Sequence, residues 1–125
     1  MPQITLQITD NIKALPEFYQ LFAEVHTAIN SIAGIKIDNC KSRVILLDNY
    51  HIGDGRDNKG FIHLEVKILE GRTNEIKSEI GKKSLQILKT SFKENNNLLD
   101  LQMTVEIIDI QKNCYYKYPE GTLNQ

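Results

Sequence analysis

Apolar and polar residues follow a period that changes along the chain in an ordered way. From Pro2 to Thr9 every second residue is apolar, which is typical of a strand with one buried face. Apolar residues then recur every three or four positions, which predicts an amphipathic helix; they are Leu15, Phe18, Phe22, Val25, Ile29 and Ile32. Pro16 is expected in the first turn of this helix and Gly34 just past its end. The apolar run from Arg43 to Leu47 predicts a short strand covered on both sides.

The same order of periods returns after the turn-rich stretch 53–60. Apolar residues alternate from Ile62 to Ile68, which predicts a third strand. A second helix is expected from Thr73 to about Asn95, with Thr73 as its N-cap; its apolar face would carry Ile76, Ile80, Ile87, Leu88 and Phe92. Strict alternation from Leu99 to Ile107 predicts the last strand.

This order predicts two β-α-β units, at about residues 2–50 and 60–110, within a single domain that covers residues 1–125 and ends in a tail over 111–125. Right-handed crossovers let both helices lie on one face of a single sheet, so the expected fold class is α/β, in the two-layer α+β arrangement. The other face of the sheet would stay open. Symmetric copies cover such a face most simply, and we therefore expect a closed oligomer.

Composition excludes several classes of function. The 15 lysines and arginines balance the 16 aspartates and glutamates, so no basic field favours nucleic acid or an anionic membrane as a partner. No apolar stretch is long enough to span a bilayer and no secretory signal is present, which predicts a cytoplasmic protein. Cys40 and Cys114 lack a CxxC pair and are expected to be reduced thiols. His26, His51 and His63 also lack a spacing suited to a shared metal, so we expect no metal site.

Pro2 is the residue with the most distinctive chemistry. It follows Met1, and removal of a methionine before proline would leave a free secondary amine at the tip of the first strand. An α-amino group has a pKa near ~8, and an apolar pocket or nearby cations lower it further, so this amine could act as a base near neutral pH. The alternative is that Pro2 is an incidental residue at the start of the chain.

Several short motifs, in their order and spacing, resemble one known family. They are Met1-Pro2, Lys41-Ser42-Arg43-Val44, Asp54-Gly55, Phe61-Ile62-His63-Leu64 and Gly71-Arg72-Thr73. They are similar to those of the 5-carboxymethyl-2-hydroxymuconate delta-isomerases, which belong to the tautomerase superfamily with 4-oxalocrotonate tautomerase and macrophage migration inhibitory factor. The resemblance covers nearly the whole chain. The run from Ile68 to Thr73 is also similar to the strand-to-helix turn of 4-oxalocrotonate tautomerase.

The resemblance implies a tautomerase fold assembled as a homotrimer. It also implies cofactor-independent ketonisation of a small carboxylated dienol, as in the breakdown of the aromatic acid homoprotocatechuate. By the same resemblance Pro2 is the general base and acid, and Arg72, together with Lys41 and Arg43, holds the substrate carboxylates. Lys41 departs from the family pattern, which has arginine there; lysine keeps the charge but loses the bidentate geometry, so the preferred substrate could differ.

Other interpretations of these residues stay open at this stage. Arg72 follows Gly71 at the start of a predicted helix, where backbone N–H groups favour an anion, but it could be a solvated surface arginine. Arg43 could form a salt bridge between subunits instead of binding substrate. The whole chain could also be a non-catalytic trimeric binding or interaction module on the same scaffold. Retention of Met1 would favour that alternative, because the Pro2 nitrogen would then be an amide without basic character.

Overall fold

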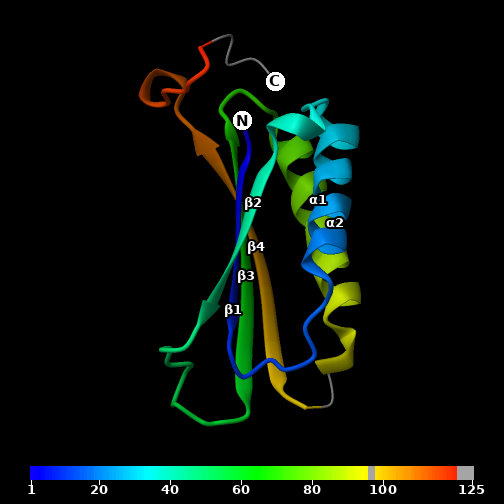
Figure 1. Ribbon diagram of the computed structural model, residues 1–125, viewed down its shortest axis with the longest axis vertical. Coiled ribbons are helices and arrows are strands. Elements are labelled where there is room, and N and C mark those ends of the chain that lie inside the picture. The colour runs from blue at the N-terminus through cyan, green and yellow to red at the C-terminus, as the bar shows by residue number, and fades with distance from the viewer. Residues whose placement is uncertain (96–97, 121–125) are drawn as a thin grey trace.

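The computed structural model of the protein describes residues 1–95 and 98–120 (Figure 1). Within these residues, two helices lie on one face of a four-stranded mixed sheet, as predicted. The strands are β1 (Gln3–Thr9), β2 (Lys41–Leu47), β3 (Lys59–Leu69) and β4 (Asp100–Ile110), and the helices are α1 (Phe18–Ala33) and α2 (Asn74–Ser91). Short 3-10 turns follow three of these elements: η1 (Ile37–Asn39), η2 (Lys93–Asn95) and η3 (Lys112–Cys114).

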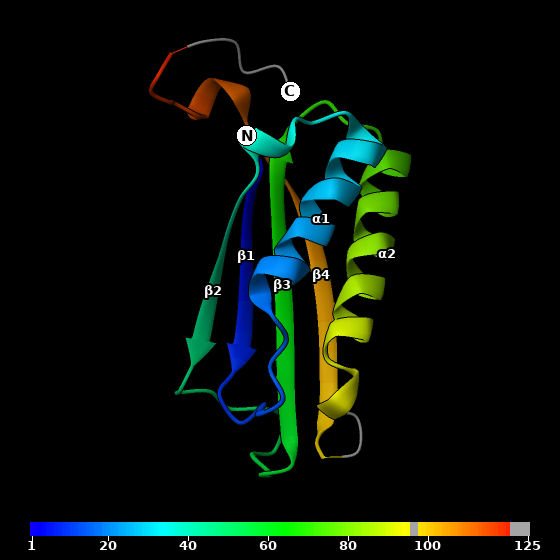
Figure 2. The same cartoon turned by 45° about the vertical axis from the view of Figure 1, so that its right-hand side comes forward.

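The sheet joins two β-α-β units through its central strands. The strand order is β2-β1-β3-β4, in which β1 is parallel to β2, β3 is parallel to β4, and β1 and β3 are antiparallel. Leu6 of β1 lies between Val44 of β2 and Leu64 of β3, which fixes the register of the two halves. Figure 2 shows both helices in front of the sheet, so its other face is left without cover in the single chain.

The hydrophobic core lies between the sheet and the helices. Alternate residues of the two central strands are fully buried; they are Ile4, Leu6, Ile8, Ile62, Leu64, Val66 and Ile68. Leu21, Val25 and Ile29 of α1 and Ile80 and Leu88 of α2 pack against them. Each such side chain contributes roughly 1.5–3 kcal/mol when fully buried. This packing holds the ends of the central strands in fixed positions.

Local chemistry sets the helix ends. Gly34 has a φ of 71° and its N–H donates to the carbonyl of Asn30, so it ends α1 as predicted. The hydroxyl of Thr73 accepts a hydrogen bond from the backbone N–H of Ile76, so the prediction of an N-cap there is also confirmed. The prediction that Pro16 lies within α1 is wrong, because Glu17 caps the helix and the helical residues begin only at Phe18.

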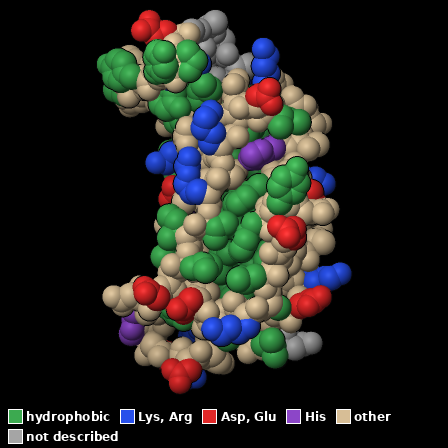
Figure 3. All heavy atoms as spheres, in the orientation of Figure 1, with side chains coloured by type: hydrophobic (Ala, Val, Ile, Leu, Met, Phe, Trp, Pro, Cys, Tyr) green, Lys and Arg blue, Asp and Glu red, His purple; other side chains and the backbone are tan. Residues whose placement is uncertain are grey.

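The second strand differs from its prediction. We expected the run 43–47 to be covered on both sides, but β2 is an edge strand that pairs with β1 alone, and the helices cover one face only. Ile45 and Leu46 are therefore 43% and 53% exposed. Hydrophobic side chains form a patch on this side of the molecule, with lysines and arginines between the patch and the end that carries the N-terminus (Figure 3).

Three further expectations concern the cysteines, the membrane and the tail. Cys40 and Cys114 are both free thiols, as predicted. No helix in the described parts of the chain is long and apolar enough to cross a membrane. Of the predicted tail over 111–125, residues 121–125 lie outside the described residues.

Candidate active site

Four segments that are distant in sequence meet at one end of the sheet. They are the N-terminus before β1, the start of β2, the turn between β3 and α2, and the segment that follows β4 (Figures 1 and 2). The topology requires this meeting, because the parallel strands β1 and β2 both begin there whereas β3 and β4 both end there. Three of the four predicted site residues lie in these segments, and Arg43 follows in β2.

Pro2 is buried, and backbone hydrogen bonding holds it in place. Its carbonyl oxygen accepts a hydrogen bond of 3.1 Å from the N–H of Lys41, which extends the pairing of β1 and β2 by one residue. The preceding Met1 is half-buried. The backbone at Pro2 is therefore fixed by the sheet, and a basic nitrogen at this position would have a defined direction.

The electrostatic surroundings favour a neutral amine at this end of the sheet. The pKa of the Met1 amine is lowered from 8.0 to about 6, chiefly by burial; the positive charges of Lys41, Lys117 and Arg72 contribute to this lowering, whereas a Cys40 thiolate opposes it. Burial raises the pKa of the Cys40 thiol, so this thiol is uncharged near pH 7 and the opposing charge is absent there. An amine in these surroundings is mostly unprotonated at neutral pH.

Arg72 lies in the tight turn between β3 and α2. Gly71 before it has a φ of 111°, a conformation that favours glycine, and Thr73 after it caps the helix. Arg72 is half-buried and sits directly before the N-terminus of α2, where the helix dipole also favours an anion. The turn is anchored by Glu70, whose N–H donates to the carbonyl of Ile110 at 2.9 Å.

Lys41 and Arg43 lie two positions apart on β2, so their side chains share the open face of the sheet. Lys41 is exposed, and its Nζ is 3.5 Å from the carbonyl oxygen of Asn39. Arg43 stands opposite Thr5 and donates from Nη2 to Oε1 of Gln3 and from Nη1 to Oγ1 of Thr5. The structure thus brings Pro2, Lys41 and Arg72 together at the end of the sheet. It places Arg43 two residues further along β2, on the open face.

Sequence reasoning missed two residues at this end of the sheet. Lys117 contributes its charge to the surroundings of the N-terminal amine, and the hydroxyl of Tyr115 accepts a hydrogen bond of 3.2 Å from Nε2 of Gln3. Both come from the segment after β4, which shows no clear strand or helix period. Gln3 and Tyr115 are 112 positions apart, so no local signal could have paired them.

The open face of the sheet also carries a cluster of titratable side chains. Nε2 of His63 lies 3.9 Å from Oε2 of Glu65 and 3.4 Å from Oε1 of Glu106, and Nδ1 lies 2.6 Å from the hydroxyl of Thr104. The ligand atoms of the imidazole and the two carboxylates lie within 4.8 Å of one another, so these three residues could hold a metal ion. The same geometry suits an imidazolium paired with two carboxylates.

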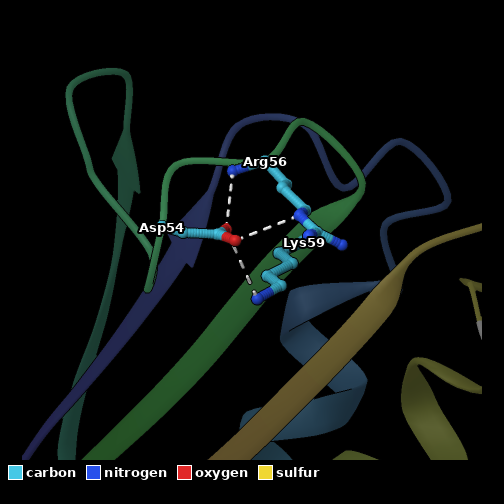
Figure 4. Close-up of polar contacts among 3 residues, drawn as sticks. All are labelled: Asp54, Arg56 and Lys59. Atoms are coloured by element: carbon cyan, nitrogen blue, oxygen red, sulfur yellow. Dashed lines mark hydrogen bonds and ion pairs between the residues drawn. The ribbon is translucent and has the colours of Figure 1, made fainter.

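The Asp54-Gly55 motif lies at the opposite end of the sheet, in the connection between β2 and β3. The carboxylate of Asp54 is 3.0 Å from Nε of Arg56 and 3.9 Å from Nζ of Lys59, and it also accepts from the N–H of Arg56 (Figure 4). Gly55 has a φ of 89°, and a Cβ there would come within 2.9 Å of the His51 ring. The motif therefore shapes a loop and does not reach Pro2.

A groove of about 1060 Å³ lies between α1 and α2, on the side of the helices away from the sheet. Tyr19, Ala28 and Ile87 are among the residues that line it. None of the four predicted site residues contributes to its wall, so we place the candidate site at the end of the sheet and not in this groove.

The fold is that of the tautomerases. It is similar to the crystal structure of a 5-carboxymethyl-2-hydroxymuconate isomerase from Deinococcus radiodurans R1, with a TM-score of 0.84, 23% identity, and coverage of 98% of this chain and 90% of that chain. It is also similar to a fused 4-OT described as a symmetric trimer, with a TM-score of 0.73 and 16% identity over 97% of this chain and 95% of that one.

Sequence comparison identifies the family within this fold. The model for the family described as 5-carboxymethyl-2-hydroxymuconate isomerase matches residues 2–120. The 5-carboxymethyl-2-hydroxymuconate Delta-isomerase of Escherichia coli is 25% identical over 117 residues, which are 94% of this chain and 93% of the relative. The chain belongs to the 5-carboxymethyl-2-hydroxymuconate isomerase family and is an isomerase, so the resemblance seen in the short motifs is confirmed.

Proposed function

We propose that this isomerase ketonises a carboxylated 2-hydroxydienoate such as 5-carboxymethyl-2-hydroxymuconate, without a cofactor, and that the amine of Pro2 is its general base and acid. The observation that supports this most is the combination of a buried Pro2 at the tip of β1 with positive charges from separate segments around the N-terminal amine. In this proposal, removal of Met1 exposes the secondary amine of Pro2 in the same surroundings.

The reaction requires one proton to move along a conjugated acid. The neutral amine takes the proton of the 2-hydroxyl group, whose oxygen forms the new carbonyl bond as the two carbon–carbon double bonds become one between C3 and C4. The ammonium then returns the proton to C5, so substrate and product have the same composition. One group can do both steps if its pKa lies near or below the working pH, which is the condition for efficient general acid–base catalysis.

Cations are needed because substrate carboxylates and the developing dienolate are both negative. Arg72 can bind a carboxylate through two parallel hydrogen bonds and remains charged at every relevant pH. Lys41 supplies a point charge near the same amine, and Arg43 supplies a second guanidinium on the open face. These cations would orient the substrate, stabilise the dienolate and keep the amine neutral.

We further propose that the enzyme works as a homotrimer in the cytoplasm, in the breakdown of aromatic acids such as homoprotocatechuate. Two features support an oligomer. Both β2 and β4 are edge strands of the sheet, and exposed apolar side chains, including Leu46 and Ile45, lie on the β2 side. The relative described as a symmetric trimer shares the fold.

A ketonisation assay tests the proposed reaction. Absorbance would follow the loss of 2-hydroxydienoates that carry one, two or three carboxylates, with wild-type enzyme and Pro2→Ala. We expect turnover that rises with the number of carboxylates and that falls strongly in Pro2→Ala, while gel filtration shows an unchanged oligomer. Equal turnover by the two proteins would count against Pro2 as the base.

A further inference from the structure

The segment after β4 turns alternate side chains toward the end of the sheet. Tyr115 and Lys117 are half-buried, whereas Tyr116 and Tyr118 are 88% and 93% exposed. Tyr115 has extended backbone angles, so the alternation reflects an extended stretch with one face on the protein. The inward residues of this stretch are the two that reach the N-terminal region, through the hydrogen bond of Tyr115 and the charge of Lys117.

A chain of hydrogen bonds leads from this segment to Arg43. Nε2 of Gln3 donates to the hydroxyl of Tyr115, and the other end of the same amide, Oε1, accepts from Nη2 of Arg43. An amide held at its nitrogen end cannot rotate freely, so its oxygen stays directed at the guanidinium. The phenol of Tyr115 therefore limits the directions that Arg43 can adopt.

The segment is also tied to the turn that carries Arg72. The carboxylate of Glu70 accepts a hydrogen bond of 2.8 Å from the N–H of Lys112, at the start of η3. One segment thus contacts both the turn before α2 and the side chain that holds Arg43 in place. It lies beside the N-terminus in both ribbon views (Figures 1 and 2).

We propose that residues 112–118 form a wall of the substrate site, in which Tyr115 is a positioning residue for Arg43 through Gln3 and Lys117 supplies an additional cation for a substrate carboxylate. This inference rests on the proposed function in that it assigns the ligand as a conjugated acid with more than one carboxylate. It assigns the recognition of the additional carboxylate to a segment that carries none of the family motifs described above.

The charge at this end of the sheet favours a ligand with more than one carboxylate. The guanidiniums of Arg43 and Arg72 and the ammoniums of two lysines are more positive charge than a single carboxylate can neutralise. Arg43 and Tyr115 contact opposite ends of the Gln3 amide, from β2 and from the segment after β4, whereas Arg72 lies just before α2. A second carboxylate would compensate the charges that the first leaves unpaired. The segment should therefore affect dicarboxylates more strongly than monocarboxylates.

Calorimetric titration with two stable probes tests this inference. The probes are cis,cis-muconate, which has a carboxylate at each end of a six-carbon diene, and sorbate, which has a carboxylate at one end only. The proteins, freed of Met1, are wild type, Tyr115→Phe and Lys117→Met, with Tyr19→Phe and Lys82→Met as matched controls on exposed side chains in the groove between the helices. Two more variants complete a double-mutant cycle: the single variant Arg43→Met and the double variant that combines Arg43→Met with Tyr115→Phe.

We expect Tyr115→Phe to weaken muconate binding about threefold to tenfold, as loss of one hydrogen bond does, and to change sorbate binding less. Lys117→Met should likewise weaken muconate binding more than sorbate binding. Both control variants should bind the two probes as wild type does. In the Arg43→Met background, Tyr115→Phe should have no further effect, which a merely structural role of Tyr115 would not produce. If Tyr115→Phe does not fold, Gln3→Leu interrupts the same chain of hydrogen bonds and must give the same pattern.

Three results would overturn the inference: wild type that does not bind muconate, equal effects on the two probes, or an undiminished effect of Tyr115→Phe without Arg43. The proposed function fails separately. A protein that shows the expected binding pattern but does not ketonise any dienol would contradict the reaction and leave the assignment of this wall intact.

Discussion

The pH dependence of turnover should report the charge of the amine at the tip of β1. An N-terminal amine with a pKa of 8.0 is about 10% neutral at pH 7, whereas one with a pKa of about 6, as at Met1, is about 90% neutral. The Pro2 amine would occupy the next position in the same surroundings. A shift of the same size would give about ten times more active base at pH 7 than an unperturbed amine would give.

The sign of the effect follows from the role of a base. Protonation inactivates it, so kcat/KM for ketonisation should rise with pH through an apparent pKa well below the ordinary value of ~8 and then reach a plateau. The measurement is a profile of kcat/KM from about pH 4.5 to 9 with the Met1-free enzyme, because this quantity reports groups of the free enzyme. A rising limb with an apparent pKa of 8 or above would show that these surroundings do not keep the amine neutral.

A charge variant tests the cause of the shift. Lys41→Met removes a cation that acts on the amine, so the apparent pKa should move upward toward the ordinary value. Lys82→Met, in the groove between the helices, removes an equal charge away from the site and should leave the profile unchanged. If both variants shift the profile alike, net charge and not the local arrangement sets the pKa.

Three further predictions concern the anion site, the helix start and the oligomer. Arg72→Ala should raise KM by roughly tenfold or more for a dicarboxylate, since hydrogen bonds to charged groups contribute about 1.5–3 kcal/mol, and by less for a monocarboxylate; a loss independent of carboxylate number argues against anion binding. Thr73→Ala should lower the free energy of unfolding by about 1 kcal/mol in denaturant titrations, whereas Thr73→Ser should not. Equal stability of the Thr73→Ala and Thr73→Ser variants would exclude the hydroxyl as the cap. Leu46→Lys should shift the oligomer to smaller species in light scattering, whereas Leu98→Lys, also at an exposed leucine, should not; an unchanged mass would place the subunit contact elsewhere.

The elements of this fold could be predicted because their signals are local. Ile4, Leu6 and Ile8 alternate with polar residues because one face of β1 packs on helices, and Gly34 and Thr73 end or begin helices through contacts within a few residues. The exposure of Leu46 could not be predicted in this way. Its apolar run has the pattern of a buried strand, and only the strand order shows that β2 lies at an edge.

Some residues of the candidate site could be predicted from local motifs, and others could not. Pro2 and Arg72 each belong to a short motif, so the sequence was enough to propose them together. Tyr115 and Lys117 reach the site only because β4 ends at the same end of the sheet at which β1 starts, and that arrangement depends on the pairing of both strands with β3. The sequence around Tyr115 contains no signal that indicates its contact with Gln3.

In the proposed mechanism, a free Pro2 nitrogen carries out the proton transfer. The most direct measurement compares kcat/KM for ketonisation of 5-carboxymethyl-2-hydroxymuconate between protein that begins at Pro2 and otherwise identical protein that retains Met1, each verified by intact mass. We predict that retention of Met1 lowers kcat/KM by at least about 100-fold, the usual contribution of a general base. Equal values for the two proteins would show that the Pro2 nitrogen is not the base.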